Sequence, residues 1–557
     1  MQRGESYWKK LMGRRLSRRQ TLRAAGRAGL GLAGMALVGC AATPTPTPAK
    51  PGATPAAPQA TATPTALKPS AGGTLKFGMS TITGFDPHTN LAGSNDDWLK
   101  PQVHDKLIEI DEKGKLVPTL YTSWENPDQL TLVAKLRQGV KFHDGSDLNA
   151  QVVKLAHDRV MNGGAPVTQN RDFKTSVAGI DMVDNYTVKY RLTEPYAGFV
   201  YFLADRSAGR ISSPAAVEKY KNDLRTVGVG TGPWVVSEWI KDDRILLKRF
   251  PDYWDKGFPY LDEINVKVVP DNTTALVTVK TGEIQFYTEL PPKDVAGVRA
   301  DPNLVAVVAP TTGYSGFMFN HKKPPFNNKA LRQAFAYAID KEAIAKGVFL
   351  GLNEVAGGPF GPGHPLYDSA IKPLPYDPAK AKEKLKEGGY PDGFEFDAEV
   401  SSAYAIRVQY AEAAQAMLAK VGIKMNIKTL DQPTVMDRAA KGEMQLWVPE
   451  FSGSEEPNQA LVLGNHSTKG TYGKAFLEGS QGAAEVDALI DKAKATYNPE
   501  ERFKLYSQIQ KTIVDEAYCT YWIVYRNARM VHRKEVKDYL PRTGPNDVYL
   551  KKVWLAK

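Results

Sequence analysis

The sequence predicts a mixed α/β protein, because it combines strand-like runs, well-capped helices and an ordinary globular composition. Residues 74–78 and 264–268 alternate apolar and polar side chains with the period of a strand. Asp377-Pro378 and Asn498-Pro499 each place an N-cap residue before a proline, ahead of apolar residues at three- or four-residue spacing. With 42% hydrophobic and 24% charged residues, the chain is predicted to be neither disordered nor a multi-span membrane protein.

The N-terminal segment, residues 1–39, is typical of an export signal peptide. A basic region ending at Arg27 precedes an apolar, glycine-rich stretch at 28–39 that is too short to span a bilayer. Within the basic region, Arg18 and Arg19 resemble the pair of a twin-arginine signal. Thr21 stands where that pattern usually has Phe, so Sec export remains open beside Tat export.

A lipid anchor and a tether are expected to follow. Leu37-Val38-Gly39-Cys40 resembles a bacterial lipobox, in which the cysteine sulfur takes the lipid. Between Ala41 and Ser70 there are eight Pro, no aromatic residue and no acid, a composition that favours extended polyproline conformations. At about 3.1 Å per residue such a tether reaches on the order of 90 Å. We therefore interpret 40–71 as a lipidated Cys40 followed by a spacer.

The remaining chain is too long for one hydrophobic core, so several subdomains or a two-lobed body are expected. The formal charge of +11 does not indicate nucleic-acid binding, because residues 1–39 hold nine basic residues and one acid and so leave +3 for residues 40–557. Only Cys40 and Cys519 are present, which excludes a disulfide framework and a cysteine-based metal site. No 20 to 50 residue repeat is found.

The helices of the second half carry clear boundaries. Asn327 or Asn328 is expected to cap a helix through Leu331, and Asp340 to cap the next. Gly388-Gly389 is expected to end the helix that begins after Asp377.

Catalytic motifs are missing from the sequence. It has no GxSxG, no HExxH, no GxxxxGK[ST] and no GxGxxG after a strand. Residues 228–232 are glycine-rich but precede a strand, so a turn with close backbone packing is expected rather than a phosphate loop. His143-Asp144-Gly145 is interpreted as a turn, and Glu455-Glu456 as a solvated or capping pair, since adjacent acids do not flank a glycosidic bond. We predict no enzyme activity, no cofactor and no metal site.

Several segments in order resemble the family 5 extracellular solute-binding proteins of bacterial ABC importers, the oligopeptide and dipeptide binders. Each segment is weak evidence for this family by itself, and the ordered set covers nearly all of residues 72–557. The matching segments are Leu116-Val117-Pro118, Ser123-Trp124-Glu125, 136–145, Gly230-Thr231-Gly232-Pro233-Trp234, Pro251-Asp252-Tyr253-Trp254, Gly282-Glu283-Ile284, Pro325-Phe326-Asn327-Asn328, 331–340, 501–506 and Asn527-Ala528-Arg529.

The resemblance implies a periplasmic-binding-protein-like two-lobed clamshell, type II, in the large family 5 form with an extra subdomain. Lobe I with that subdomain would take 72–312 plus 520–557, and lobe II would take 313–519. Such a protein binds a solute between its lobes and makes or breaks no bond. The implied partners are the transmembrane permease subunits with their ATPase and the membrane, reached through the lipid on Cys40, with a monomer as the default. The implied location is the outer face of the cytoplasmic membrane.

The resemblance also points to ligand-binding positions. In peptide-binding members a segment near lobe II supplies an aspartate for the ligand's α-ammonium, and here that stretch is 450–457. Phe451 stands where those members have a Trp, and Ser454 or Gly453 stands where they have the Asp. Glu450 or Glu455 is the alternative source of the carboxylate.

Tyr314, Phe317 and Trp447 are the other candidate contacts, because aromatic side chains there would stack on a ligand. Asp86, in the loop after the first strand, is open to a binding or a turn role.

Peptides are the preferred ligand class. If neither Glu450 nor Glu455 reaches the cleft, another solute such as an oligosaccharide or an opine-like compound is preferable, because a buried ammonium needs a counter-charge. The alternatives from other classes are an exported hydrolase that borrowed the binding fold and a chemosensory binding protein.

Overall fold

The structure is a computed structural model that describes residues 68–88, 98–111, 114–162, 171–204, 208–220, 223–362, 364–454, 456–516, 518–541 and 548–557. The chain divides into the units 1–68 and 69–557, and the second is described here. The expected signal peptide, the lipidation site Cys40, the export residues Arg18 and Arg19 and Glu455 lie outside the described residues. Within the part that the structure describes, no helix has both the length and the hydrophobicity needed to cross a bilayer.

The central element is a mixed sheet with the strand order β14-β13-β15-β12-β17-β11-β1-β10-β9-β8, and β16 pairs with β12 beside this path. Strands β1, β10 and β11 pair in parallel, as do β13, β14 and β15, whereas β12 and β17 are antiparallel. The strands are β1 (Thr74–Met79), β8 (Trp234–Ile240), β9 (Arg244–Arg249), β10 (Glu263–Val268), β11 (Phe286–Tyr287), β12 (Leu304–Phe319), β13 (Glu395–Ser401), β14 (Lys424–Leu430), β15 (Leu446–Trp447), β16 (Glu450–Phe451) and β17 (Thr520–Arg533).

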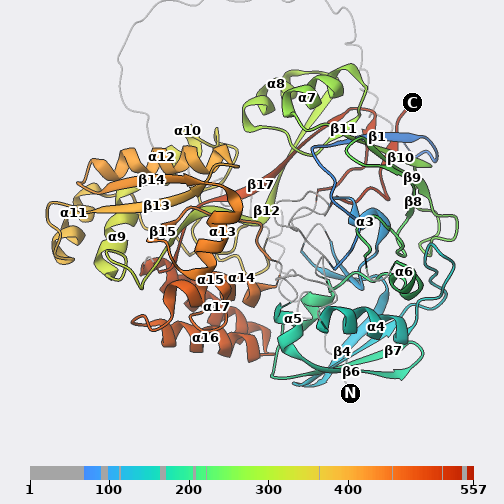
Figure 1. Cartoon of the computed structure of the whole chain (residues 1–557), viewed down its shortest axis with the longest axis horizontal. Coiled ribbons are helices and arrows are strands. Elements are labelled where there is room, and N and C mark those ends of the chain that lie inside the picture. Colours follow the sequence, from blue (N-terminus) through green and yellow to red (C-terminus); the bar gives the residue numbers. More distant parts are fainter. Residues whose placement is uncertain are drawn as a thin grey trace, which may run out of the picture. The chain divides into compact units, whose positions relative to one another are not determined.

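The two long strands β12 and β17 join two regions that have separate hydrophobic cores (Figure 1). One core packs β1, β8, β9 and β10 with the C-terminal residues, and it includes both Phe77 and Val553. At the other end of the sheet two further cores pack, one around Phe335 and one around Trp522. The described chain is therefore an α/β protein with two lobes that share one sheet.

Helices from the second half of the chain form these two further cores. They bury apolar stripes at helical spacing, as Leu505, Ile509 and Ile513 do on α17. The helices are α9 (Lys329–Ala338), α10 (Lys341–Gly347), α11 (Pro378–Glu387), α12 (Ala405–Ala419), α13 (Gln432–Lys441), α14 (Pro457–Asn465), α15 (Thr471–Leu477), α16 (Ala483–Ala495) and α17 (Pro499–Asp515).

A separate antiparallel sheet, β4-β5-β7-β6, forms a subdomain of the first lobe with α4 to α6. Its members are β4 (Tyr121–Asp128), β5 (Thr131–Leu136), β6 (Val177–Asp184), β7 (Thr187–Leu192), α4 (Ala150–Met161), α5 (Arg171–Ser176), α6 (Pro214–Lys219) and the 3-10 helix η3 (Phe199–Leu203). The remaining elements are α3 (Lys100–Val103), β2 (Ile108–Ile110), β3 (Leu116–Pro118), α7 (Asn272–Thr281), η4 (Pro292–Asp294), α8 (Val295–Ala300), β18 (Val536–Lys537) and β19 (Trp554–Leu555).

The expected helix boundaries are confirmed. Asn328, Asp340, Asp377 and Asn498 each accept a backbone N–H bond at the start of their helix, and α11 ends at Gly388. The strands expected at 74–78 and 264–268 are β1 and β10. Local sequence therefore determined where these elements begin, because each cap satisfies a backbone donor that no neighbour within the helix can reach.

Candidate functional site

The ladder between β12 and β17 is interrupted where the chain passes from one lobe to the other. Pairing runs from Leu304 to Pro310, shifts register, and resumes at Tyr314 opposite Tyr525. In the gap, the Thr311 hydroxyl donates to the Arg526 carbonyl at 3.0 Å and accepts from the Gly313 N–H at 3.1 Å. A bulge of this kind bends a strand and interrupts regular pairing, and we refer to residues 311–313 together with Arg526 as the hinge.

Strand β16 pairs with β12 directly after this hinge. Phe451 lies opposite Tyr314 and Glu450 lies opposite Ser315. The structure therefore brings together three positions that the sequence singled out, Tyr314, Glu450 and Phe451, although 135 residues separate Ser315 from Glu450.

The aromatic side chains at this point form one connected group. The Tyr314 ring lies 5.2 Å from that of Phe451 and 6.0 Å from that of Trp522. Trp447 lies 5.6 Å from Phe451 and 4.7 Å from Tyr472. Tyr314 and Trp447 are buried, whereas Phe451 is half-buried. Phe451 is thus the most exposed of these residues, and Tyr314 and Trp447 pack against it.

Phe317 occupies a different environment. Its side chain is fully buried and packs on the rings of Phe335 and Tyr410 at 5.3 and 5.6 Å. These rings belong to the core beneath α9 and α12. We therefore leave Phe317 out of the candidate site.

Glu450 is held by cations and a hydroxyl. Ser315 donates to its Oε1 at 2.7 Å, Arg407 Nε lies 3.5 Å from its Oε2, and Arg526 Nε lies 3.9 Å from Oε1. Burial by itself opposes ionisation, yet Arg526, Arg407 and Ser315 together hold the Glu450 pKa below its usual value. The Arg407 guanidinium also stacks 3.8 Å from the centre of the Tyr404 ring. Glu450 is therefore an ionised carboxylate that already has two cationic neighbours.

The segment after β16 turns into α14. The Ser454 hydroxyl donates to Gln459 Oε1 at 2.7 Å and accepts from the Glu456 N–H at 3.1 Å. The Glu456 carboxylate caps α14 by accepting the Gln459 N–H at 2.5 Å. The capping interpretation of this acidic pair is thus confirmed for Glu456.

The same carboxylate connects the two lobes. The Tyr196 hydroxyl, which follows β7 in the small subdomain, donates to Glu456 Oε2 at 2.8 Å. Beside it, Lys494 of α16 forms an ion pair with Glu194 at 2.5 Å, and its carbonyl accepts from the Ala197 N–H at 2.9 Å. Burial raises the Glu456 pKa to about 7, because hydrogen bonds and Arg502 only partly offset the desolvation. Sequence reasoning missed Tyr196, Arg407, Arg526 and Lys494, since only the fold brings them to these contacts.

Asp86, which the sequence left open between a binding and a turn role, is 2% exposed, forms a bidentate ion pair with Arg159 with its nearer contact at 2.6 Å, and accepts the His88 N–H at 3.0 Å. Two turn interpretations are confirmed. His143 Nε2 lies 2.9 Å from the Gly232 carbonyl, and Gly145 adopts a φ of +85°. A Cβ at Gly230 would lie 2.1 Å from the Val103 carbonyl, so the glycine-rich segment serves close backbone packing.

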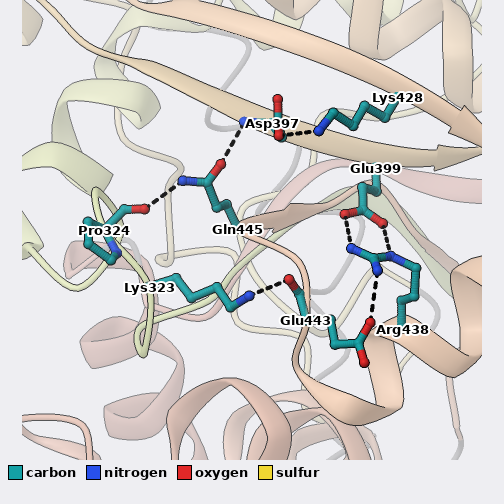
Figure 2. Close-up of a pocket in the computed structure, with 8 residues that line it drawn as sticks. All are labelled: Lys323, Pro324, Asp397, Glu399, Lys428, Arg438, Glu443 and Gln445. Carbon is teal, nitrogen blue, oxygen red and sulfur yellow. Dashed lines mark hydrogen bonds and ion pairs between the residues drawn. The ribbon is translucent and has the colours of Figure 1, made fainter.

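A pocket of about 410 Å³ lies beside strands β13 and β14 and helix α13, among the charged side chains that Figure 2 shows. Arg438 binds both Glu399 oxygens at 2.7 and 2.8 Å and Glu443 at 2.8 Å, and Lys428 pairs with Asp397. The charges that line the pocket therefore compensate one another, and none of the ligand-binding residues predicted from the sequence lines it. Among the described residues, no group of three or more His, Cys, Asp or Glu is placed to hold a metal ion.

Comparisons with known proteins agree with this architecture. The family model described as bacterial extracellular solute-binding proteins, family 5, middle, matches residues 115–472. The glutathione-binding protein GsiB of Salmonella typhi is 34% identical over 480 residues, which cover 84% of this chain and 91% of that protein.

Solved structures show the same fold. The periplasmic binding protein DppA of Helicobacter pylori in complex with the peptide STSA has a TM-score of 0.75 at 26% identity and covers 88% of this chain and 99% of its own. AgaA of A. tumefaciens R10 in complex with agropinic acid has a TM-score of 0.74 at 27% identity, with 87% and 99% covered. The expected two-lobed clamshell fold is thereby confirmed.

Proposed function

Because the chain belongs to the bacterial extracellular solute-binding proteins of family 5, we propose that it is the binding component of an ABC importer for a peptide or peptide-like solute. It would bind that solute between its lobes and deliver it to the transmembrane permease and its ATPase. No chemical step is involved in this work, because ligand contacts to both lobes lower the free energy of the closed state.

One observation carries the proposal: Phe451 and Glu450 lie on β16, which pairs with β12 directly after the bulge, and the segment that follows β16 contacts the small subdomain through Glu456. The bulge after Pro310 supports bending at this point. The Tyr196–Glu456 and Glu194–Lys494 contacts support a closed form in which the small subdomain touches the second lobe.

The same features support lobe boundaries near those expected, with lobe I at 72–312 and lobe II beginning at 313. Residues 521–525 pack into the two cores of the second lobe. We therefore propose that lobe II extends to about 525, rather than 519, and that lobe I resumes at the hinge residue Arg526.

We propose that Phe451, Tyr314, Trp447 and Ser454 form the wall of the ligand cleft. Glu455 remains a candidate for binding an α-ammonium group. Glu450 is a weaker candidate, because its carboxylate is already shared by Arg407, Arg526 and Ser315. The peptide, glutathione and agropinic acid in the names of the similar proteins support a ligand with amide and carboxylate groups.

We also propose export through the signal at 1–39 and anchoring by a lipid on Cys40, with the protein acting as a monomer at the outer face of the cytoplasmic membrane. The lipobox-like sequence and the Pro-rich tether support this location. Replacing Cys40 by Ser should move the protein from the membrane fraction to the soluble fraction and abolish labelling by radioactive palmitate. Unchanged membrane association and labelling would contradict the anchor.

The first test of function is a thermal shift assay of the purified protein with separate pools of peptides, opines, oligosaccharides and amino acids. A ligand that binds only the folded form raises Tm. A rise with peptides or opines supports the proposal, and a rise with oligosaccharides alone would contradict the ligand class while leaving the importer role intact. Turnover of a bound oligomer would instead favour the exported-hydrolase alternative.

A further inference from the structure

A short segment after β7 holds the small subdomain against the second lobe. Glu194 pairs with Lys494 of α16 at 2.5 Å, and the Ala197 N–H donates to the Lys494 carbonyl at 2.9 Å. The Tyr196 hydroxyl donates to Glu456 Oε2 at 2.8 Å, and the centre of its ring lies 4.4 Å from the Lys494 ammonium. Each of these contacts joins the two lobes, so opening of the protein breaks all of them together. We call this set of five residues the latch.

The same segment covers the carboxylate of Glu456. Its Oε2 accepts the Tyr196 hydroxyl, and from its own lobe it also accepts the Gln459 N–H at 2.5 Å. Its Oε1 lies so close to the Gly198 backbone that a Cβ added at Gly198 would be 2.3 Å from it. Glu456 is 3% exposed, and the other lobe supplies part of this burial. Opening of the latch would therefore return the carboxylate to water.

Glu456 differs from Glu450 in how its charge is balanced. Two arginines lie 3.5 and 3.9 Å from the oxygens of Glu450. For Glu456, burial has the largest effect on the pKa, and the hydrogen bonds of Gln459 and Tyr196 and the charge of Arg502 offset only part of it. Its pKa is about 7 while the carboxylate is covered. Once water reaches the group, the pKa should return toward its ordinary value of 4.5.

Other titratable groups face this carboxylate from the neighbouring elements. Lys494 of α16 is held by Glu194 in an ion pair. Tyr506 of α17 is buried, and burial and, next, the Glu456 charge raise its pKa, so its hydroxyl remains protonated. Arg502, also on α17, contributes the guanidinium charge already named. Glu456 is therefore the latch residue that responds to opening with a change of protonation.

We propose that the latch is proton-dependent: Glu456 takes up one proton from water when the small subdomain closes on the second lobe, and releases it on opening. This inference rests on the proposed function as a binding protein whose lobes open and close, and adds a means of regulation. Protonation at Oε1 leaves Oε2 to accept from both donors, so the neutral carboxyl fits the closed latch without a buried charge. Closing is therefore favoured fully below about pH 4.5 and progressively less as the pH rises to about 7.

Hydrogen exchange of the purified full-length protein without ligand tests this inference. The Ala197 amide is the probe, because its hydrogen bond crosses the latch and the amide exchanges when the latch opens. After correction for the pH dependence of exchange itself, its protection in the wild type should fall at least 10-fold between pH 5 and pH 8. Proton uptake by one group with the two pKa values above permits at most about 70-fold.

Variants assign the pH dependence to Glu456. Glu456→Gln keeps an oxygen for both donors and removes the ionisation, so its Ala197 protection should vary less than 3-fold between pH 5 and pH 8. Tyr196→Phe should lower the protection at both pH values, because it removes a hydrogen bond of the latch. Glu412→Gln, at an exposed position on α12, should follow the wild type. Circular dichroism of each variant identifies loss of folding, and the wild-type profile keeps the test decisive if Glu456→Gln unfolds.

Wild-type protection that does not change between pH 5 and pH 8, or a fall of equal size in Glu456→Gln, would overturn the proton-dependent latch. An Ala197 amide that is unprotected at both pH values would overturn it too, because the latch would then not close. None of these results bears on the ligand, which is absent from the experiment. Failure of the proposed function is instead measured by the thermal shift assay with the ligand pools.

Discussion

The buried carboxylate of Glu456 should make the stability of the protein depend on pH. Glu456 is 3% exposed, caps α14 and accepts the Tyr196 hydroxyl from the other lobe. Burial raises its pKa from 4.5 to about 7. Below pH 4.5 the carboxyl is protonated in the folded and unfolded protein alike, so its contribution to stability is fully present. That contribution is lost as the pH rises through 7, because the folded protein must then ionise a buried group.

The magnitude follows from the pKa difference. A shift of this size corresponds to on the order of 3 kcal/mol between the two protonation states. Over residues 69–557 the entropy of unfolding is about 1 kcal/mol/K. Glu456→Gln keeps the oxygen that accepts from Gln459 and Tyr196 and removes the charge, so at pH 8 it should raise Tm by about 3 °C. At pH 5, only just above the unfolded pKa, this difference should shrink to less than about 1 °C.

Differential scanning calorimetry from pH 5 to 8 measures this difference. Other buried groups also titrate, among them Asp105, whose pKa burial raises to about 6, so only the difference between wild type and variant is assigned to Glu456. Glu412→Gln, at an exposed position on α12, is the control and should follow the wild-type curve. A Tm difference between wild type and Glu456→Gln that stays constant from pH 5 to 8 would refute the argument.

Three further predictions concern the hinge, the core and the contact between the lobes. Gly453→Ala should lower the free energy of unfolding by about 1–3 kcal/mol and weaken ligand binding, because at a φ of +80° the added Cβ would lie 2.1 Å from the Thr312 carbonyl oxygen of the hinge. Gly479→Ala is the control: Gly479 has a φ of +77° and nothing within 4 Å of that position, so this variant should lower Tm less. Asp86→Asn breaks the buried ion pair with Arg159 and should lower the free energy of unfolding, measured by urea unfolding, by about 3–5 kcal/mol. Asp181→Asn, which breaks an exposed pair with Arg191, should lower it by at most about 1 kcal/mol. Tyr196→Phe should weaken ligand binding about 10-fold in calorimetry with little change in Tm, because it removes a hydrogen bond between the lobes; an unchanged Kd would contradict the role of that contact.

Local features of the structure were largely predictable from the sequence. The caps at Asn328, Asp340, Asp377 and Asn498 were each recognisable because a capping side chain bonds a backbone N–H two or three residues ahead. The turn at His143 and the close packing of the glycine-rich segment at 228–232 followed from residue type in the same way. The family and the fold class were indicated by ordered short segments that extend over most of the chain.

The candidate site was predictable only in part. The aromatic positions Tyr314, Trp447 and Phe451 do meet, and Phe317, three residues from Tyr314 on the same strand, lies in another core. Side chains alternate between the two faces of a strand, and the register shifts at the hinge decide which face each residue takes. No local pattern contains that information.

Composition and neighbours a few residues apart were enough to predict the α/β class and the starts of the helices, and from the same signals we expect the export and tether segments. The pairing of distant strands was needed to place Glu450 beside Arg407 and Arg526, and the contact between the lobes to bring Tyr196 to Glu456, 260 residues away. The electrostatic environment and the burial of Glu450 and Glu456 depend on side chains from distant segments of the sequence. They arise only when β12, β16 and β17 pair and the two lobes come into contact.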